Sequence, residues 1–228
     1  MAKKIMFNDK YSLTQAVLDG RKTMTRRIIK CPRTFKGEWV AGFNIHRRHS
    51  DKKIVGWPCM YDADEREFDM GEIFPKYKVG EVLSIAQSYE SLGMNPEIAL
   101  NDKDGIGFYT KTKFAPGWKN KMFVRADLIP HHIRITNIKI ERLQDISDED
   151  CLAEGVVKVT HTVPTKAPQC LISYYPCLSL KEAADKVGWG ITYSTPQLAF
   201  ATLIDKVSGK GTWESNPYVF VYEFELID

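Results

Sequence analysis

The stretch HIRITNIKIERL, His132 to Leu143, decides the fold class because it is the clearest strand in the chain. Its isoleucines alternate with polar residues, but the alternation changes parity in the middle: Ile133 and Ile135 share one face, and Ile138 and Ile140 share the other. A one-residue shift flips faces, which predicts a β-bulge at Thr136–Asn137 or two strands that meet at a bend. Both devices are typical of small β-barrels.

The segments on either side of this strand also have local signals. SDEDCLAEG begins with Ser147 as a helix N-cap, has acidic residues in the first turn and closes with Gly155, which predicts a short helix that ends on Glu154. A turn at Gly80 precedes an expected strand, and residues 218–226 alternate as a last strand.

Three more stretches predict helices. The first has apolar residues at helical spacing before a C-terminal glycine: Leu13, Ala16, Val17 and Gly20. The second has Ser179 and Glu182 at capping-box spacing, and the third starts with Thr195 as cap and Pro196 at the first position. With an extended segment at 22–29, these elements predict an α+β fold with a mostly antiparallel β core or small barrel.

Two regions interrupt the pattern. Residues 37–76 have weak periodicity and predict an irregular insertion, and residues 156–178 are proline-rich and predict a loop-like second insertion that extends to about residue 195. Residues 105–112 are a further strand candidate. We therefore expect one domain over 1–228 with insertions at about 37–76 and 156–195.

Composition narrows the class of protein. No apolar stretch approaches the roughly 20 residues that cross a bilayer, and the start of the chain has no signal-peptide core, so we expect a cytoplasmic protein without a membrane partner. The five cysteines form no C-x-x-C pair and predict free thiols. His46 and His49 enclose two arginines, which disfavours a metal site, and no cofactor is expected. A net charge of +3 does not by itself require a nucleic-acid partner.

The densest cluster of charge is LDGRKTMTRR, Leu18 to Arg27. A lysine held near Arg26 and Arg27 has its pKa pushed down and can act as a base, and a nearby threonine hydroxyl is a candidate nucleophile, which points to Lys22 and Thr25. The alternative is a basic strand on a solvated surface. Lys22 and Thr25 have opposite parity and would point to opposite faces of an ideal strand. A shared site therefore requires the turn after Gly20 to extend through Thr23.

Glu154 is the second candidate. An acidic side chain at a helix C-terminus opposes the helix dipole, and such local violations are often functional, although an exposed glutamate is the simpler interpretation.

Together these positions resemble one family. Gly20, Lys22, Thr25 and Arg27 match the G-x-K-x-x-T-x-R motif of ASCH domains, and YKVGEVL, ITNIKIERLQDISDEDCLAEG and WESNPYVFVYEFEL are similar to blocks of the larger ASCH-type proteins of phages and gut bacteria. The resemblance implies a PUA-like small antiparallel or mixed β-barrel with attached helices, and an RNA-related role.

One branch of that family hydrolyses the amide of N4-acetylcytidine. By resemblance, Lys22 would be the base, Thr25 the nucleophile and Glu154 the proton donor, and Arg27 would face the ligand or stabilise an oxyanion. Arg21 and Arg26 would be solvent-facing or would steer phosphates, and Gly20 would shape the turn.

The partner implied is RNA or a modified nucleoside. Tyr89 and Trp213 are candidates for stacking on a base, although Trp213 could instead cap the core beside the last strand. Two alternatives remain. The first is a non-catalytic RNA-binding module that depends on four arginines, Arg26, Arg27, Arg47 and Arg48. The second is a phage-encoded protein that contacts a host partner through its insertions.

Overall fold

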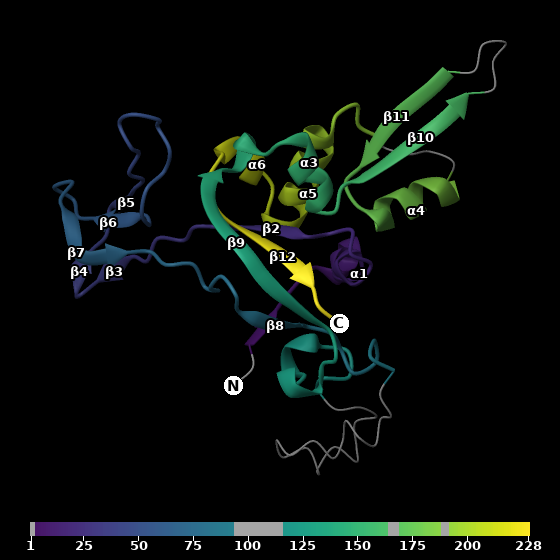
Figure 1. Ribbon diagram of the computed structural model, residues 1–228, viewed down its shortest axis with the longest axis horizontal. Coiled ribbons are helices and arrows are strands. Elements are labelled where there is room, and N and C mark those ends of the chain that lie inside the picture. Colours follow the sequence, from purple (N-terminus) through teal and green to yellow (C-terminus); the bar gives the residue numbers. More distant parts are fainter. Residues whose placement is uncertain (1–2, 94–115, 164–168, 188–191) are drawn as a thin grey trace.

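A five-stranded sheet with the order β1-β8-β9-β12-β2 forms the centre of the computed structural model, which describes residues 3–93, 116–163, 169–187 and 192–228. The strands are β1 (Lys3–Ile5), β8 (Val82–Ile85), β9 (His132–Arg142), β12 (Tyr218–Leu226) and β2 (Met24–Ile28). β1 and β8 run parallel, and the other neighbours are antiparallel. Figure 1 shows β9 and β12 crossing the middle of the molecule side by side.

The shift in the isoleucine pattern is a β-bulge, as predicted. Glu223 of β12 pairs with Asn137 and Phe224 pairs with Ile135, so Thr136 is the extra residue on β9. Ile135, before the bulge, is fully buried, and Ile138, after it, packs against the same core while partly exposed. The bulge therefore lets isoleucines of opposite parity reach one core.

Five α-helices lie within the described part of the chain: α1 (Leu13–Leu18), α3 (Asp148–Ala153), α4 (Leu178–Val187), α5 (Pro196–Ser208) and α6 (Thr212–Ser215). Short 3-10 turns cover Asp9–Tyr11, Lys121–Phe123, Ala126–Leu128 and Leu143–Asp145. The predicted caps of α3 and α5 are confirmed, since Ser147 accepts a hydrogen bond from the Asp150 amide and Thr195 accepts one from the Leu198 amide. The start predicted at Ser179 is wrong, because α4 begins at Leu178.

The region 37–76 is not irregular, contrary to the prediction. It carries two small antiparallel sheets with the preceding residues: β3 (Thr34–Phe35) with β4 (Glu38–Trp39), and β5 (Gly42–Asn44), β6 (Cys59–Tyr61) and β7 (Glu67–Glu72). Most of these strands have two or three residues, which is too short to produce a period-two pattern. Figure 1 shows the small sheets beside the central one.

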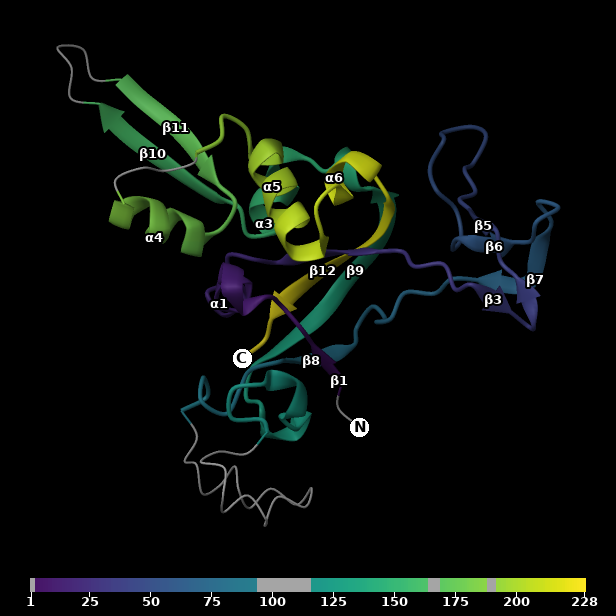
Figure 2. The ribbon, with the colours of Figure 1, turned by 180° about the vertical axis from the view of Figure 1, so that it is seen from behind.

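The region 156–178 is also more regular than predicted. β10 (Val157–Val163) and β11 (Gln169–Tyr175) form an antiparallel hairpin that projects from the body in Figures 1 and 2. The sequence VKVTHTV alternates valine with polar residues, so a strand signal is present there beside the prolines. The expected strand at 105–112 lies outside the described residues.

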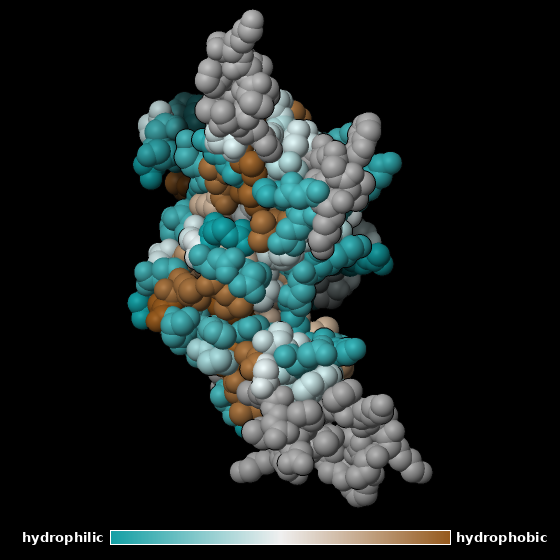
Figure 3. Space-filling view, turned by 90° about the vertical axis from the view of Figure 1, so that its right-hand side faces the viewer, coloured by the Kyte–Doolittle hydropathy of each residue, from teal (hydrophilic) through white to brown (hydrophobic). Residues whose placement is uncertain are grey.

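The chain is thus of the mixed α+β class, as expected. Figure 3 shows one side of the molecule, on which hydrophobic side chains gather in separate patches between hydrophilic ones. Among the residues that the structure describes, every helix is too short or too polar to span a bilayer.

Candidate functional site

A cavity of about 610 Å³ lies between the segment that follows β1 and the edge strand β2. Its polar lining includes Lys22, Thr25, Arg26 and Glu154, together with four further residues: Asn8, Arg27, Lys30 and Ser208. Its apolar lining includes two aromatic rings and two aliphatic side chains: Phe7, Phe200, Leu203 and Ile204. We call this cavity the lysine pocket. An apolar wall combined with polar groups is typical of small-molecule sites.

The turn after α1 brings Lys22 into this pocket. Gly20 has a φ of +70°, which ends the helix, and the Lys22 amide donates to Ala16 O over 2.8 Å. The Thr23 amide then donates to Ala153 O over 2.9 Å, and β2 begins only at the next residue. The turn therefore extends through Thr23, as a shared site for Lys22 and Thr25 required.

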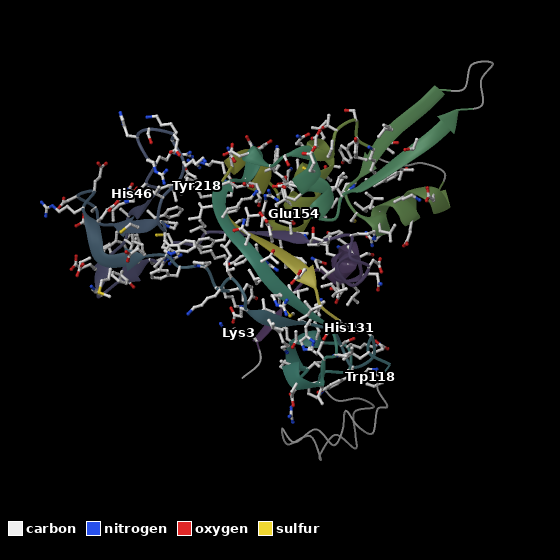
Figure 4. All side chains as sticks on the ribbon, in the orientation of Figure 1. Lys3, His46, Trp118, His131, Glu154 and Tyr218 are labelled. Atoms are coloured by element: carbon white, nitrogen blue, oxygen red, sulfur yellow. The ribbon has the colours of Figure 1, made fainter. Side chains whose placement is uncertain are left out.

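Lys22 and Glu154 form a buried ion pair. Lys22 Nζ lies 2.5 Å from Glu154 Oε2 and donates to the Glu154 carbonyl oxygen over 2.8 Å, and the two side chains are 2% and 6% exposed. Figure 4 shows Glu154 in the middle of the molecule, beside the central sheet. The interpretation of Glu154 as an exposed glutamate is therefore wrong.

Burial lowers the pKa of Lys22 below its ordinary value. The carboxylate of Glu154 opposes this shift, and the charges of Arg27 and Arg26 add to it. The amine therefore loses its proton more easily than an exposed lysine, as the sequence predicted for a lysine among arginines.

Gly155 shapes the backbone beside this pair. Its φ is +107°, and a Cβ at this position would lie 3.2 Å from Leu13 Cδ2 and 3.7 Å from Lys22 Cδ. A glycine is required both by this left-handed backbone and by the close approach of α1, so the end of α3 and the Lys22 side chain pack directly against each other.

Arg26 is not solvent-facing, which corrects the prediction. Its side chain is 1% exposed and binds three carboxylates. The guanidinium lies 2.6 Å from Glu141, 2.6 Å from Asp150 and 3.2 Å from Glu154. Burial opposes its charge, but Glu154 and Glu141 outweigh burial and raise the pKa of Arg26. The arginine therefore holds Glu154 in place from the side opposite Lys22.

Lys139 extends this network on β9. Its Nζ lies 3.2 Å from Asp150 and 3.4 Å from Glu141. Burial opposes ionisation of Asp150, but hydrogen bonds from Arg26 and Lys139 outweigh it and hold the pKa of Asp150 below its usual range. The sequence analysis did not identify Glu141, Asp150 or Lys139 as site residues, because nothing local links them to Arg26.

Thr25 lies on β2 opposite Tyr222 of β12, is 5% exposed and lines the lysine pocket. In the described part of the chain, no hydrogen bond joins its hydroxyl to Lys22 or Glu154. The three predicted catalytic residues thus share one pocket, and the lysine and the glutamate are in direct contact.

The other motif residues lie at the edge. Arg27 is exposed, lines the pocket and donates from Nη2 to Met6 O over 2.6 Å. Arg21 is exposed and pairs with Asp19 at 2.8 Å. Gly20 is not part of the pocket lining and acts as the helix cap.

Neither aromatic candidate for stacking lies in the pocket. Tyr89 is 1% exposed and packs with Val124 and Ile129 in a separate cluster, so it cannot contact a base on the surface. Trp213 is partly buried against the main core, with its ring centroid 6.1 Å from that of Phe200. The interpretation of Trp213 as a core cap is therefore the correct one.

Metal and thiol chemistry have little support in the described residues. His46 pairs with Glu67 at 2.9 Å, and no group of three His, Cys, Asp or Glu side chains within the described ranges could hold a metal ion. Cys31, Cys59, Cys151 and Cys177 are free thiols. Burial raises the pKa of Cys151 to about 12, so this thiol stays protonated and unreactive.

No local signal in the sequence marks the apolar wall of the pocket. Phe200 and Leu203 lie at the spacing of one helix face, which is typical of core residues, and Phe7 follows a short strand. Only their position beside Lys22 in space gives them a role in the site.

Comparison of the chain with protein-family models, with curated proteins and with solved structures finds no match.

Proposed function

We propose that the chain is an ASCH-like protein whose lysine pocket binds a modified nucleoside or RNA base and hydrolyses an amide on it, as in N4-acetylcytidine. The observation that carries this proposal is the buried Lys22–Glu154 pair on the wall of a pocket that Thr25 also lines. A buried acid and base in contact, next to a hydroxyl, is the set of groups that amide hydrolysis needs.

The arrangement of the sheet supports a PUA-like barrel. β1 and β2 are the end strands of the sheet, yet Arg27 of β2 donates to Met6 O, just after β1. The two edges therefore approach each other across the lysine pocket, as the edges of a sheet that curls toward closure do.

The size and walls of the pocket suit a flat ring. A volume of about 610 Å³ exceeds that of a nucleobase, and the ring of Phe7 and the exposed side chain of Val207 offer apolar surface to it. When the base lies in the pocket, the charged groups of Lys22, Arg26 and Glu154 lie beside its exocyclic group.

The ion pair can exchange its proton without exposure to water. When Lys22 gives its proton to Glu154, the pair becomes a neutral amine and a carboxylic acid, which burial favours. Lys22 then takes the proton of Thr25, and the Thr25 oxygen attacks the acetyl carbon. The C–N bond breaks as Glu154 gives its proton to the leaving nitrogen.

Water completes the cycle. A water molecule gives a proton to the Glu154 carboxylate, and its oxygen attacks the acetyl group on Thr25. The Thr25 oxygen leaves and recovers its proton from Lys22. The sum is one amide and one water converted to acetic acid and the free amine, with all three side chains restored.

The direct test is incubation of the protein with N4-acetylcytidine. We expect cytidine and acetate in equal amounts, measured by chromatography. Thr25→Ser keeps the hydroxyl and should keep turnover, whereas Thr25→Val keeps the shape and should lower kcat/KM by about a hundredfold or more. Absence of product with the wild-type protein, or equal turnover by Thr25→Val, would show that the proposal is wrong.

The pH profile gives a separate prediction. Because burial lowers the pKa of Lys22, its neutral form increases with pH below the ordinary lysine value of 10.5. We expect kcat/KM for N4-acetylcytidine to rise with pH along a limb whose midpoint lies below 10.5. The measurement uses subsaturating substrate in buffers of constant ionic strength. A profile without such a limb would remove Lys22 as the base.

A non-catalytic RNA-binding module remains the second candidate, favoured by the exposure of Arg27, Arg47 and Arg48. It requires binding of RNA that weakens steeply with salt and that occurs without turnover. Arg26 does not contribute to RNA binding in this second candidate, because carboxylates enclose its guanidinium.

A further inference from the structure

A second cavity, of about 550 Å³, lies where the first insertion packs against β9. We call it the insertion pocket. The insertion contributes Arg47, Lys53 and Trp57, and the other side contributes residues 138–141 and Asp145. It shares no lining residue with the lysine pocket.

Aromatic contacts fix the insertion against the sheet at this point. The ring of Trp57 lies 6.0 Å from that of Phe220 of β12, and the ring of Phe43 lies 6.3 Å from that of Tyr218. Figure 4 shows His46 of the insertion next to Tyr218 at this junction. The wall that Trp57 forms is therefore built into the core and does not depend on a mobile loop.

The cations of the insertion pocket are available for a ligand. Within the described residues, neither Arg47 nor Lys53 has an acidic side chain within ion-pair distance, and both residues are exposed. Their neighbour Arg48, in contrast, pairs with Asp51 at 3.3 Å and does not line the pocket. Arg47 donates to Lys52 O over 3.1 Å and to the Tyr218 hydroxyl, but a guanidinium has five N–H donors, so part of it remains for a ligand. Two cations that form no ion pair among the described residues, on the same pocket rim, are suited to a phosphate group.

The remaining lining residues have other chemistry. Glu141 and Lys139 lie in the network of Arg26, so their charges are already compensated. Ile138 and Ile140 add apolar surface beside Trp57. Asp145 is exposed and can accept hydrogen bonds from hydroxyl or amino groups.

We infer that the insertion pocket is a second binding site, which takes a nucleotide. Arg47 and Lys53 bind its phosphate, Trp57 and the isoleucines contact its base, and Asp145 accepts hydrogen bonds from its sugar or base. The ligand is a free mononucleotide or one nucleotide of a single-stranded RNA, because both present the same groups.

The test is calorimetric titration of the full chain with three probes: cytidine, cytidine 5′-monophosphate and a short single-stranded RNA. We expect the monophosphate or the RNA to bind at least tenfold more tightly than cytidine, because only they carry phosphate. Arg47→Gln with Lys53→Gln should weaken this binding by about tenfold or more. Binding of the monophosphate identifies a free nucleotide as sufficient, and binding of the RNA alone identifies the nucleic acid.

A matched control removes the same charge nearby. Arg48→Gln with Lys52→Gln changes two exposed cations that do not line the pocket and should leave binding unchanged. The residues changed in the two double variants all lie outside the lysine pocket, so a difference between the variants reports on the insertion pocket. Equal binding of cytidine and its phosphate, equal effects of the two double variants, or no binding of any probe would overturn the inference.

Discussion

Replacing Lys22 by methionine is expected to lower kcat/KM for N4-acetylcytidine by about a thousandfold, because methionine is unbranched like lysine, although one atom shorter, and cannot accept the proton of Thr25. The same change removes one partner of a buried ion pair and should lower the free energy of unfolding by about 3 kcal/mol. Single-turnover kinetics and urea denaturation measure the two effects.

The two effects can be separated by a double variant. Lys22→Met with Glu154→Gln leaves no unpaired charge from this pair, so part of the lost stability should return while turnover stays low. Lys206→Met, which removes an exposed lysine from α5, is the control and should change neither quantity much. A Lys22→Met protein as stable as this control would contradict the described ion pair.

Arg26→Met should have the largest effect on stability. It leaves the carboxylates of Glu141, Asp150 and Glu154 without their shared partner, and we expect a loss of about 4 kcal/mol at neutral pH. The adjacent Arg27→Met changes an exposed side chain and should cost less than about 1 kcal/mol.

The pH dependence of this loss has a definite sign. In the wild-type protein the pKa of Asp150 is held below the ordinary value of 3.8, so the stability it contributes is present above that pH and is lost as the pH falls. In Arg26→Met the Asp150 carboxylate loses a hydrogen bond that favours its charge and protonates more easily, so the deficit in stability relative to wild type should shrink as the pH falls toward 4. Urea denaturation at neutral and acidic pH measures it, and a deficit that grows with acidity would contradict the arrangement.

The parts of the fold that the sequence predicted are those with local causes. The bulge at Thr136 follows from the isoleucine pattern, and the cap at Ser147 follows from its own hydroxyl and the amide of Asp150. The extended segment expected over 22–29 is shorter in the structure, because β2 begins at Met24, and the turn through Thr23 was only the condition for a site that Lys22 and Thr25 share.

The parts that failed depend on residues far apart in the chain. Arg26 was taken for a surface charge because its three carboxylate partners lie 115 to 128 positions away. Tyr89 is buried by Val124, which belongs to a different segment. No periodicity or cap signal carries such information, because tertiary packing alone decides it.

The enclosure of Arg26 also constrains how this chain can change over generations. Arg26 is linked through carboxylates both to Lys22 and to Lys139, so a single substitution at Lys22, Arg26 or Glu154 leaves a buried charge with fewer partners. Replacements that are harmful one at a time become tolerable in compensating combinations. Selection therefore acts on this ion-pair network as one inherited unit, and its charged residues are expected to persist together or to be lost together.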